Sequence, residues 1–296
     1  MVERNRREGV LFATRFELDA DVSASELEVV CSVWAELHRT WTSFDDQSPL
    51  QRLNRSDGEW VEVEPLLLWA ARSCVAATEA TNGLFNPLVD LVAIEYTNTW
   101  PSAADSEAFV MLDQCLETRG SEVRLPKGLS LDLGGVAQAM AADWAVSYLK
   151  ESGADVACAD IGGAVAVLGE RQVAVEHANG NVWWNWKVTG GGVCTSSTQS
   201  PEQVGRRCNA NHLTGHSVDS VFSTVSSHAG SAFAAEIANW TVHASGSLES
   251  ARDVTGAVIV AGCDNGIQVE QTSTARLYGS PAMRSSQWNL AERVER

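Results

Sequence analysis

The sequence from residue 129 to residue 153 reads LSLDLGGVAQAMAADWAVSYLKESG. Its first residues predict a short strand, Gly134-Gly135 predicts a tight turn, and the apolar residues that follow at helical spacing predict a helix that ends at Ser152-Gly153. Asp132 directly precedes the turn. Backbone N–H groups at a helix start suit a phosphate, and glycine lets a ligand approach the backbone. Taken alone, the stretch is more typical of an ordinary strand-turn-helix unit, because it lacks the G-x-G-x-x-G spacing of a dinucleotide site.

Upstream of this stretch the sequence alternates between strand and helix patterns. Ser23-x-x-Glu26 is a capping box and predicts the start of a helix. Other expected elements in this half are a strand at 10–18, a structured loop at 42–54, a short strand at 61–63, and a helix from Pro65 to Asn82-Gly83.

Downstream, short apolar runs separated by glycines predict strands, and Asn179-Gly180 is a strong hairpin signal. The expected strands are 156–161, 164–168, 173–175, 182–188, 193–196 and 257–261, with a helix at 232–245. Mixed helices and hairpins indicate an α+β fold with a mostly antiparallel sheet packed with helices. We expect one domain over residues 1–296, with its core at about 10–262; two lobes would also fit the pattern.

Composition and charge exclude several function classes. The 21 basic and 38 acidic residues give a net charge of −17, which would repel a nucleic-acid backbone. No run of 18 apolar residues predicts a membrane span, and no apolar run with a small-residue cleavage site marks a signal peptide. The seven cysteines are odd in number and contain no C-x-x-C, so reduced thiols and a cytoplasmic location are expected.

Six sequence blocks together resemble one enzyme family. Each block alone is weak, but they occur in the family's order. The blocks are TSFDDQSPLQRLN at 42–54, TNGLFNP at 81–87, LDLGGVAQAMAAD at 131–143, DIGG at 160–163, TSS at 195–197 and AEIANW at 235–240. They are similar to S-x-[YF]-x-x-x-S-x-L-x-R-[LF]-N, T-x-G-A-F-D-P, L-D-L-G-G-I-A-K-G-Y-A-V-D, N-x-G-G, T-S-G and A-D-A-L-A-T of the FAD:protein FMN transferases, the ApbE-type flavin transferases.

The resemblance implies an ApbE-like flavin transferase fold and a defined reaction. Such enzymes bind FAD and a divalent cation, usually Mg²⁺, and join FMN to a Ser or Thr hydroxyl of an acceptor flavoprotein with release of AMP. With only three lysines in the chain, an oxygen-ligated metal is the simplest way to neutralise two phosphates. The residues that the resemblance assigns to FAD are Phe12, Phe44, Leu84, Phe85, Asn86, Asp132 and Gln138. Those that it assigns to the metal are the Gly135 carbonyl, Glu236 and Asn239.

Several positions depart from the family pattern. Trp240 replaces a metal-binding Thr, and indole is no ligand for Mg²⁺. The family's H-x-I-D-P-x-T-G block, in which the His assists transfer, is altered. Counted back without gaps from Thr214-Gly215, the His position is Cys208; with a short deletion it is His212. Both alignments stay open.

These departures keep two alternatives to the transferase in view. One is a degenerate family member that binds FAD or a related nucleotide without transferring it. The other is a scaffold that uses the fold for protein contacts. Quenching of the eleven tryptophans by added FAD would distinguish a nucleotide-binding protein from a scaffold.

Overall fold

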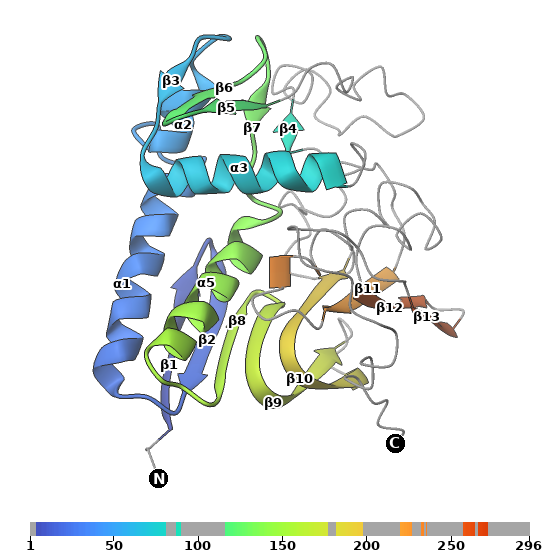
Figure 1. Cartoon of the computed structure of the whole chain (residues 1–296). Helices are drawn as coiled ribbons and strands as arrows, with labels where there is room; N and C mark the ends of the chain where they lie inside the picture. Colours follow the sequence, from blue (N-terminus) through green and yellow to red (C-terminus); the bar gives the residue numbers. More distant parts are fainter. Residues whose placement is uncertain are drawn as a thin grey trace.

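The computed structural model describes residues 4–80, 87–89, 116–176, 182–197, 220–226, 232–233, 235, 257–263 and 266–271. Two long helices, α1 (Ala24–Trp41) and α5 (Ala137–Glu151), lie side by side against one face of a large sheet (Figure 1). Among the described residues, no helix combines the length and the apolar character that crossing a membrane requires.

The large sheet has eight strands in the order β1-β2-β8-β9-β10-β11-β12-β13, and every neighbouring pair is antiparallel. This confirms the predicted α+β fold with a mostly antiparallel sheet. The strands are β1 (Asn5–Leu11), β2 (Thr14–Ala20), β8 (Ala157–Ile161), β9 (Ala164–Glu176), β10 (Val182–Ser197), β11 (Ser220–Ser226), β12 (Ala257–Cys263) and β13 (Gly266–Gln271).

The prediction of one strand at 10–18 was wrong. The chain forms a hairpin instead, in which Leu11 pairs with Thr14. Phe12 and Ala13 make the turn with φ of 49° and 60°, in the left-handed region that non-glycine residues rarely adopt. No Gly or Asn marks this turn, so the usual hairpin signal is missing from the sequence.

Strands β9 and β10 are longer than predicted. The segments expected at 164–168 and 173–175 form one strand, as do those at 182–188 and 193–196. Gly169, which lies between the two predicted segments, has φ +75° but is part of β9. Pairing of Val182 with Glu176 confirms the hairpin that the sequence predicted between them. Long paired strands can continue through a local irregularity of this kind. The pairing of β10 with β9 likewise continues past a register shift between Thr189 and Gly191.

Helices were predicted from Ser23, from Pro65 and up to Ser152-Gly153, and the structure confirms these three boundaries. Of the helix predicted at 232–245, residues 232, 233 and 235 are described and are helical, and the rest lies outside the described residues. Ser23 caps α1 by accepting a hydrogen bond from the Glu26 N–H. Helix α3 (Pro65–Ala80) begins at the predicted proline, and α5 ends with Ser152 as its C-cap. The indole N–H of Trp34 donates to the Ala141 carbonyl at 2.9 Å, which fixes α1 against α5.

The segment 42–54, expected as a loop, contains the short helix α2 (Pro49–Asn54). Ser48 caps it, accepting from the Gln51 N–H at 3.1 Å, and Pro49 occupies the first turn. Two small sheets lie beyond α3 in Figure 1: one is built from β3 (Val61–Glu62), β6 (Glu122–Arg124) and β5 (Glu117–Arg119), the other from β4 (Leu88–Val89) and β7 (Ser130–Leu131).

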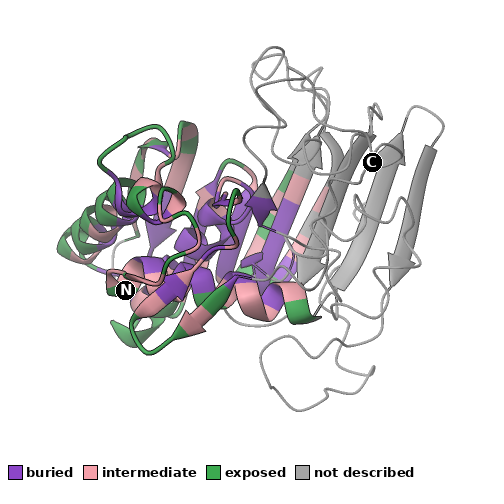
Figure 2. Cartoon of the chain, turned by 90° about the horizontal axis from the view of Figure 1, so that it is seen from above, coloured by how far each residue is buried: buried purple, intermediate pink, exposed green. Residues whose placement is uncertain are grey.

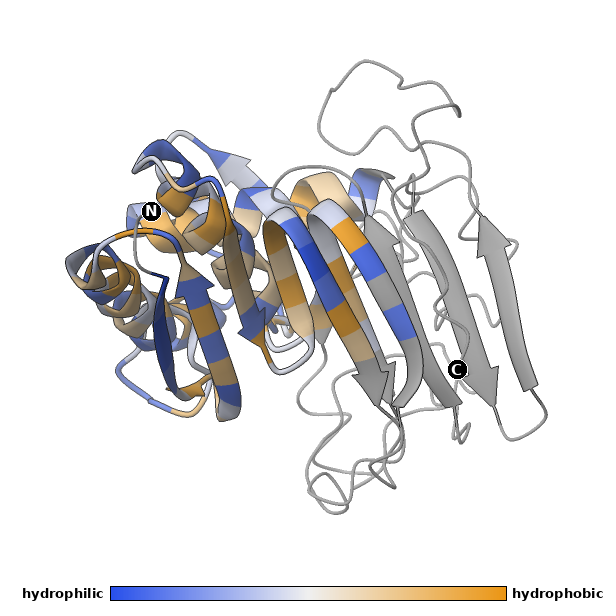
Figure 3. Ribbon diagram, turned by 90° about the horizontal axis from the view of Figure 1, so that it is seen from below, coloured by the Kyte–Doolittle hydropathy of each residue, from blue (hydrophilic) through white to orange (hydrophobic). Residues whose placement is uncertain are grey.

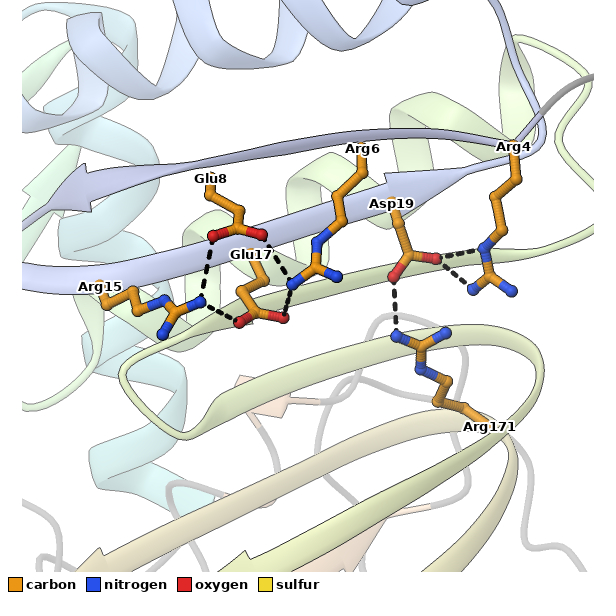
Figure 4. Close-up of polar contacts among 7 residues, drawn as sticks. All are labelled: Arg4, Arg6, Glu8, Arg15, Glu17, Asp19 and Arg171. Carbon is orange, nitrogen blue, oxygen red and sulfur yellow. Dashed lines mark hydrogen bonds and ion pairs between the residues drawn. The ribbon is translucent and has the colours of Figure 1, made fainter.

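The two faces of the sheet differ in character. Buried residues concentrate between the sheet and the helices (Figure 2), where Leu18 of β2 and Ala159 of β8 are fully enclosed. Hydropathy alternates along strands of the described part of the sheet, as the period of two requires (Figure 3). The face turned away from the helices carries two groups of ion pairs (Figure 4). One is formed by Arg6, Glu8, Arg15 and Glu17, and in the other Asp19 pairs with Arg4 and Arg171.

Candidate functional site

The turn between β7 and α5 holds the aspartate that the sequence singled out. The carboxylate of Asp132 accepts a 2.7 Å hydrogen bond from the Gly134 N–H, so the side chain folds over the glycine turn. The Leu133 carbonyl then accepts from the N–H groups of Val136 and Ala137, at 3.0 and 2.8 Å, and starts the helix. Val136 is the N-cap of α5, and no side chain caps it.

Two other parts of the chain hold the backbone just before Asp132. The Asn54 side chain accepts from the Leu131 N–H at 2.8 Å and donates to the Leu131 carbonyl at 3.1 Å. The Asp132 N–H donates to the Pro87 carbonyl at 2.9 Å, beside the pairing of Leu88 with Leu131. The blocks at 42–54, 81–87 and 131–143, which are far apart in sequence, therefore meet at this turn.

Cys74 of helix α3 lies close enough to the turn to interact electrostatically with Asp132. The Cys74 side chain is fully buried, and burial together with the negative charge of Asp132 raises the pKa of the thiol to about 12. A thiol with this pKa stays protonated at neutral pH, so Cys74 acts as a small packing residue and not as a nucleophile.

A second tight turn joins β8 to β9 and brings two further blocks together. The Asp160 carboxylate accepts from the Gly163 N–H at 3.0 Å, and the Thr195 N–H donates to the Gly163 carbonyl at 3.1 Å. Burial raises the pKa of Asp160, while the Gly163 N–H lowers it. Gly162 has φ +62°, and a Cβ there would lie 2.7 Å from the Thr14 methyl, so only glycine fits.

Asp143 of α5, which was not among the predicted site residues, links this helix to a distant part of the chain. Its two carboxylate oxygens accept from the N–H groups of Ala232 and Phe233, at 2.7 and 3.0 Å. These residues and Ala235 are helical and buried. Burial raises the pKa of Asp143 to about 7, against the two N–H donors that lower it. The signal was available, since Asp143 is the last residue of the block at 131–143 and Asn54 is the last of the block at 42–54.

The structure distributes the predicted flavin-binding residues unevenly. Asp132 lies in the turn and Gln138, partly buried, lies in the first turn of α5. Phe12 contacts Trp41 by stacking, with ring centroids 6.2 Å apart, and His38 edge-on at 5.5 Å. Phe44 is 93% exposed. The candidates Leu84, Phe85 and Asn86 lie outside the described residues.

Of the predicted metal-binding residues, the structure describes Gly135, which is buried beside Asp132 in the turn. Glu236 and Asn239 lie outside the described residues, as do the predicted catalytic residues Cys208 and His212. Within the part of the chain that is described, no three His, Cys, Asp or Glu side chains gather closely enough to hold a metal ion.

Comparison with known proteins gives a consistent result. The sequence model of the ApbE family matches residues 12–274. A search of curated proteins finds no match. Among solved structures, the flavin transferase ApbE from Vibrio cholerae has a TM-score of 0.72 at 15% identity, covering 92% of this chain and 98% of that one.

Two further structures agree in fold. The ApbE protein from Thermotoga maritima has a TM-score of 0.70 at 18% identity, covering 91% of this chain and 97% of that one. The flavinyl transferase ApbE from Pseudomonas stutzeri, in its apo form, has a TM-score of 0.70 at 16% identity, covering 95% and 98%. At these identities the likeness establishes the fold.

Proposed function

The chain belongs to the ApbE family, and from this premise we propose that it transfers FMN from FAD to a Ser or Thr hydroxyl of an acceptor flavoprotein, releasing AMP. The observation that carries the proposal is the Asp132 turn, in which three of the family-like blocks meet. The flavin transferase from Vibrio cholerae and the flavinyl transferase from Pseudomonas stutzeri share the fold, and their names support flavin transfer in general. In this proposal the chain forms a single flavin transferase domain.

The Asp132 turn has the properties that an FAD site needs. A carboxylate lies beside a glycine pair, where a ring or sugar hydroxyl can approach the backbone. The start of α5 directly after it presents the positive end of the helix dipole, which favours phosphate. In this proposal Asp132 and Gln138 contact FAD, with Phe12, Phe44, Leu84, Phe85 and Asn86 completing the site.

We assign Mg²⁺ binding to the Gly135 carbonyl, Glu236 and Asn239, whose oxygen donors suit this ion. One observation supports the assignment. The Asp143 carboxylate on α5 accepts from the N–H groups of Ala232 and Phe233, and α5 directly follows the turn that contains Gly135. Glu236 follows shortly in sequence. When bound, Mg²⁺ neutralises the pyrophosphate and the AMP leaving group.

The transfer itself exchanges one phosphorus–oxygen bond for another. The acceptor hydroxyl oxygen bonds to the FMN phosphorus, the bond from that phosphorus to the AMP oxygen breaks, and the hydroxyl proton passes to a base. We assign the base to His212, because imidazole accepts a proton at neutral pH, whereas Cys208 as a thiolate favours nucleophilic and oxidative chemistry.

A second reading is a family member that binds FAD or a related nucleotide and does not transfer it. The positions that favour it are Trp240 in place of a metal-binding Thr, Asn86 in place of an Asp, and the altered block around Cys208 and His212.

A cytoplasmic location is part of the main proposal, supported by the free thiols Cys31, Cys74 and Cys158.

The decisive experiment is incubation of the full chain with FAD, Mg²⁺ and a flavinylation acceptor, followed by in-gel flavin fluorescence of the acceptor. We expect a fluorescent acceptor band, and none when the acceptor Ser or Thr is replaced by Ala. Tight FAD binding by the parent without any acceptor band would favour the non-transferring reading. Absence of both binding and labelling would contradict both readings.

A further inference from the structure

Strand β7 is too short to hold its own position. It has two residues, and its partner β4 also has two. Leu131 of β7 is opposite Leu88 of β4, and the bond next to this pair runs from the Asp132 N–H to the Pro87 carbonyl. In an antiparallel ladder this marks a non-hydrogen-bonded pair, so the N–H and carbonyl of Leu131 point away from β4.

In the part of the chain that the structure describes, β7 pairs with a strand on one edge, and the Asn54 side chain bonds to its other edge. A carboxamide carries one acceptor oxygen and a donor nitrogen in the geometry of a peptide group, and Asn54 uses both on Leu131. Because the Leu131 N–H can only donate and its carbonyl can only accept, the orientation of the Asn54 amide is fixed by its partners. The Asn54 side chain thereby makes with Leu131 the two hydrogen bonds that a residue of a third strand would make.

Asn54 is itself held firmly. It is the last residue of α2, whose Leu50 and Leu53 are fully buried and whose start is capped by Ser48. The backbone that carries the carboxamide is therefore packed into the core. One covalent step beyond Leu131 lies Asp132, whose carboxylate is bonded to the Gly134 N–H.

We propose that Asn54 is the positioning residue of the flavin site: by holding Leu131 on the edge opposite β4, it fixes where Asp132 directs its carboxylate. This inference rests on the proposed function of Asp132. It makes Asn54 a residue that acts through Asp132 and does not itself contact FAD.

The variant Asn54→Asp tests this with little change in volume. A carboxylate still accepts from the Leu131 N–H, but its second oxygen faces the Leu131 carbonyl and repels it. The matched control is Asn5→Asp, because the Asn5 amide donates to the Val22 carbonyl at 2.8 Å, also in a partly buried position and outside the turn. We expect tryptophan fluorescence titration to show FAD affinity lowered about tenfold in Asn54→Asp and unchanged in Asn5→Asp.

A double-mutant cycle separates positioning from general destabilisation. If Asn54 acts through Asp132, then Asn54→Asp has little further effect on FAD affinity in an Asp132→Ala background. An equal loss of affinity in both backgrounds would overturn the proposal, since it would mean that Asn54 affects binding by another route. Melting temperatures of all variants establish that they are folded, and Asn54→Ala repeats the cycle if Asn54→Asp does not fold.

Amide hydrogen exchange gives a readout that does not need FAD. We expect faster exchange in the peptide over residues 129–136 in Asn54→Asp and parent-like exchange there in Asn5→Asp. Unchanged exchange in this peptide would also overturn the proposal. A parent protein that binds no FAD would contradict the proposed function alone, and faster exchange would then still support the positioning of the turn by Asn54.

Discussion

The Asp143 carboxylate on α5 accepts a 2.7 Å hydrogen bond from the backbone N–H of Ala232, a residue 89 positions further along the chain. Its other oxygen accepts from Phe233. Ala232 and Phe233 are both in helical conformation, and a carboxylate far away in sequence accepts hydrogen bonds from both of their N–H groups. These two hydrogen bonds join α5, which follows the Asp132 turn, to the segment directly before the proposed metal-binding residues Glu236 and Asn239.

The first prediction concerns the pH dependence of stability. The pKa of Asp143, about 7 in the folded chain, lies above the ordinary 3.8. The folded state therefore holds more protons between these values, and this contribution to stability, present at low pH, is lost as the pH rises through 7. Asp143→Asn removes it. The free energy of unfolding of the parent should fall from pH 5 to pH 8. We expect this fall to be smaller in Asp143→Asn, by on the order of 2 kcal/mol.

Urea unfolding at the two pH values measures this difference. The matched control is Asp21→Asn, because Asp21 also accepts from two successive N–H groups, those of Asp155 and Val156, at 3.1 and 3.0 Å. This control measures the effect of replacing a carboxylate that accepts from two backbone N–H groups elsewhere in the chain. The same pH dependence in Asp143→Asn as in the parent would show that Asp143 does not titrate in this range.

The second prediction concerns FAD binding. Replacing Asp132 by Ala removes the proposed flavin contact and the bond to the Gly134 N–H. We expect a loss of about 1–3 kcal/mol in FAD binding free energy, the range for a charge-assisted hydrogen bond. Fluorescence titration measures it, with Asp46→Ala, on the exposed loop before α2, as the control. Equal FAD affinity of Asp132→Ala and the parent would remove Asp132 from the site.

The third prediction concerns the β8–β9 turn. Gly162 and Gly120 both have left-handed φ, +62° and +55°, but a Cβ at Gly162 would meet Thr14 at 2.7 Å, whereas one at Gly120 would meet nothing within 4 Å. Gly120→Ala carries only the backbone cost of about 1–2 kcal/mol. We expect Gly162→Ala to lose a further 1–3 kcal/mol or so by overpacking. Urea unfolding measures the loss in free energy of unfolding of each variant. Equal losses would mean that the Thr14 side chain moves away from the new methyl group without a loss of stability.

The fourth prediction decides which alignment of the altered block is right. If His212 is the base, acceptor labelling is lost in His212→Ala and survives in Cys208→Ala, because an imidazole and not a thiol takes the hydroxyl proton. In-gel flavin fluorescence of both variants beside the parent measures this. Labelling that disappears in Cys208→Ala and persists in His212→Ala would reverse the assignment.

Local chemistry made part of the fold predictable from the sequence. The cap at Ser23, the proline at position 65 and the glycine pair before α5 act within a few residues, and the structure confirms the elements that they predict. The missed helix α2 also had a local signal, Ser48 followed by Pro49, which the polar composition of the segment masked. The hairpin turn at Phe12 had none.

The candidate site was less predictable, because its bonds join distant parts of the chain. Asp132 and its glycine turn were identified from one continuous segment. Asn54 and Asp143 bond to backbone groups 77 and 89 positions away, and backbone groups carry no sequence signature. The family-like blocks contained both residues, but only the folded chain shows what their side chains bind.

The pairing of β2 with β8 has a consequence for how the protein is made. Ala20 pairs with Ala157, so the edge of β2 stays open while everything between them is synthesised. At roughly 5–20 residues per second this wait is on the order of ten seconds, and an isolated two-stranded hairpin is only marginally stable in water. An open strand edge invites pairing with other nascent chains, and charges on such a strand oppose it. Arg15 and Glu17 place charges of this kind on β2, and in the folded sheet the same two side chains form an ion pair.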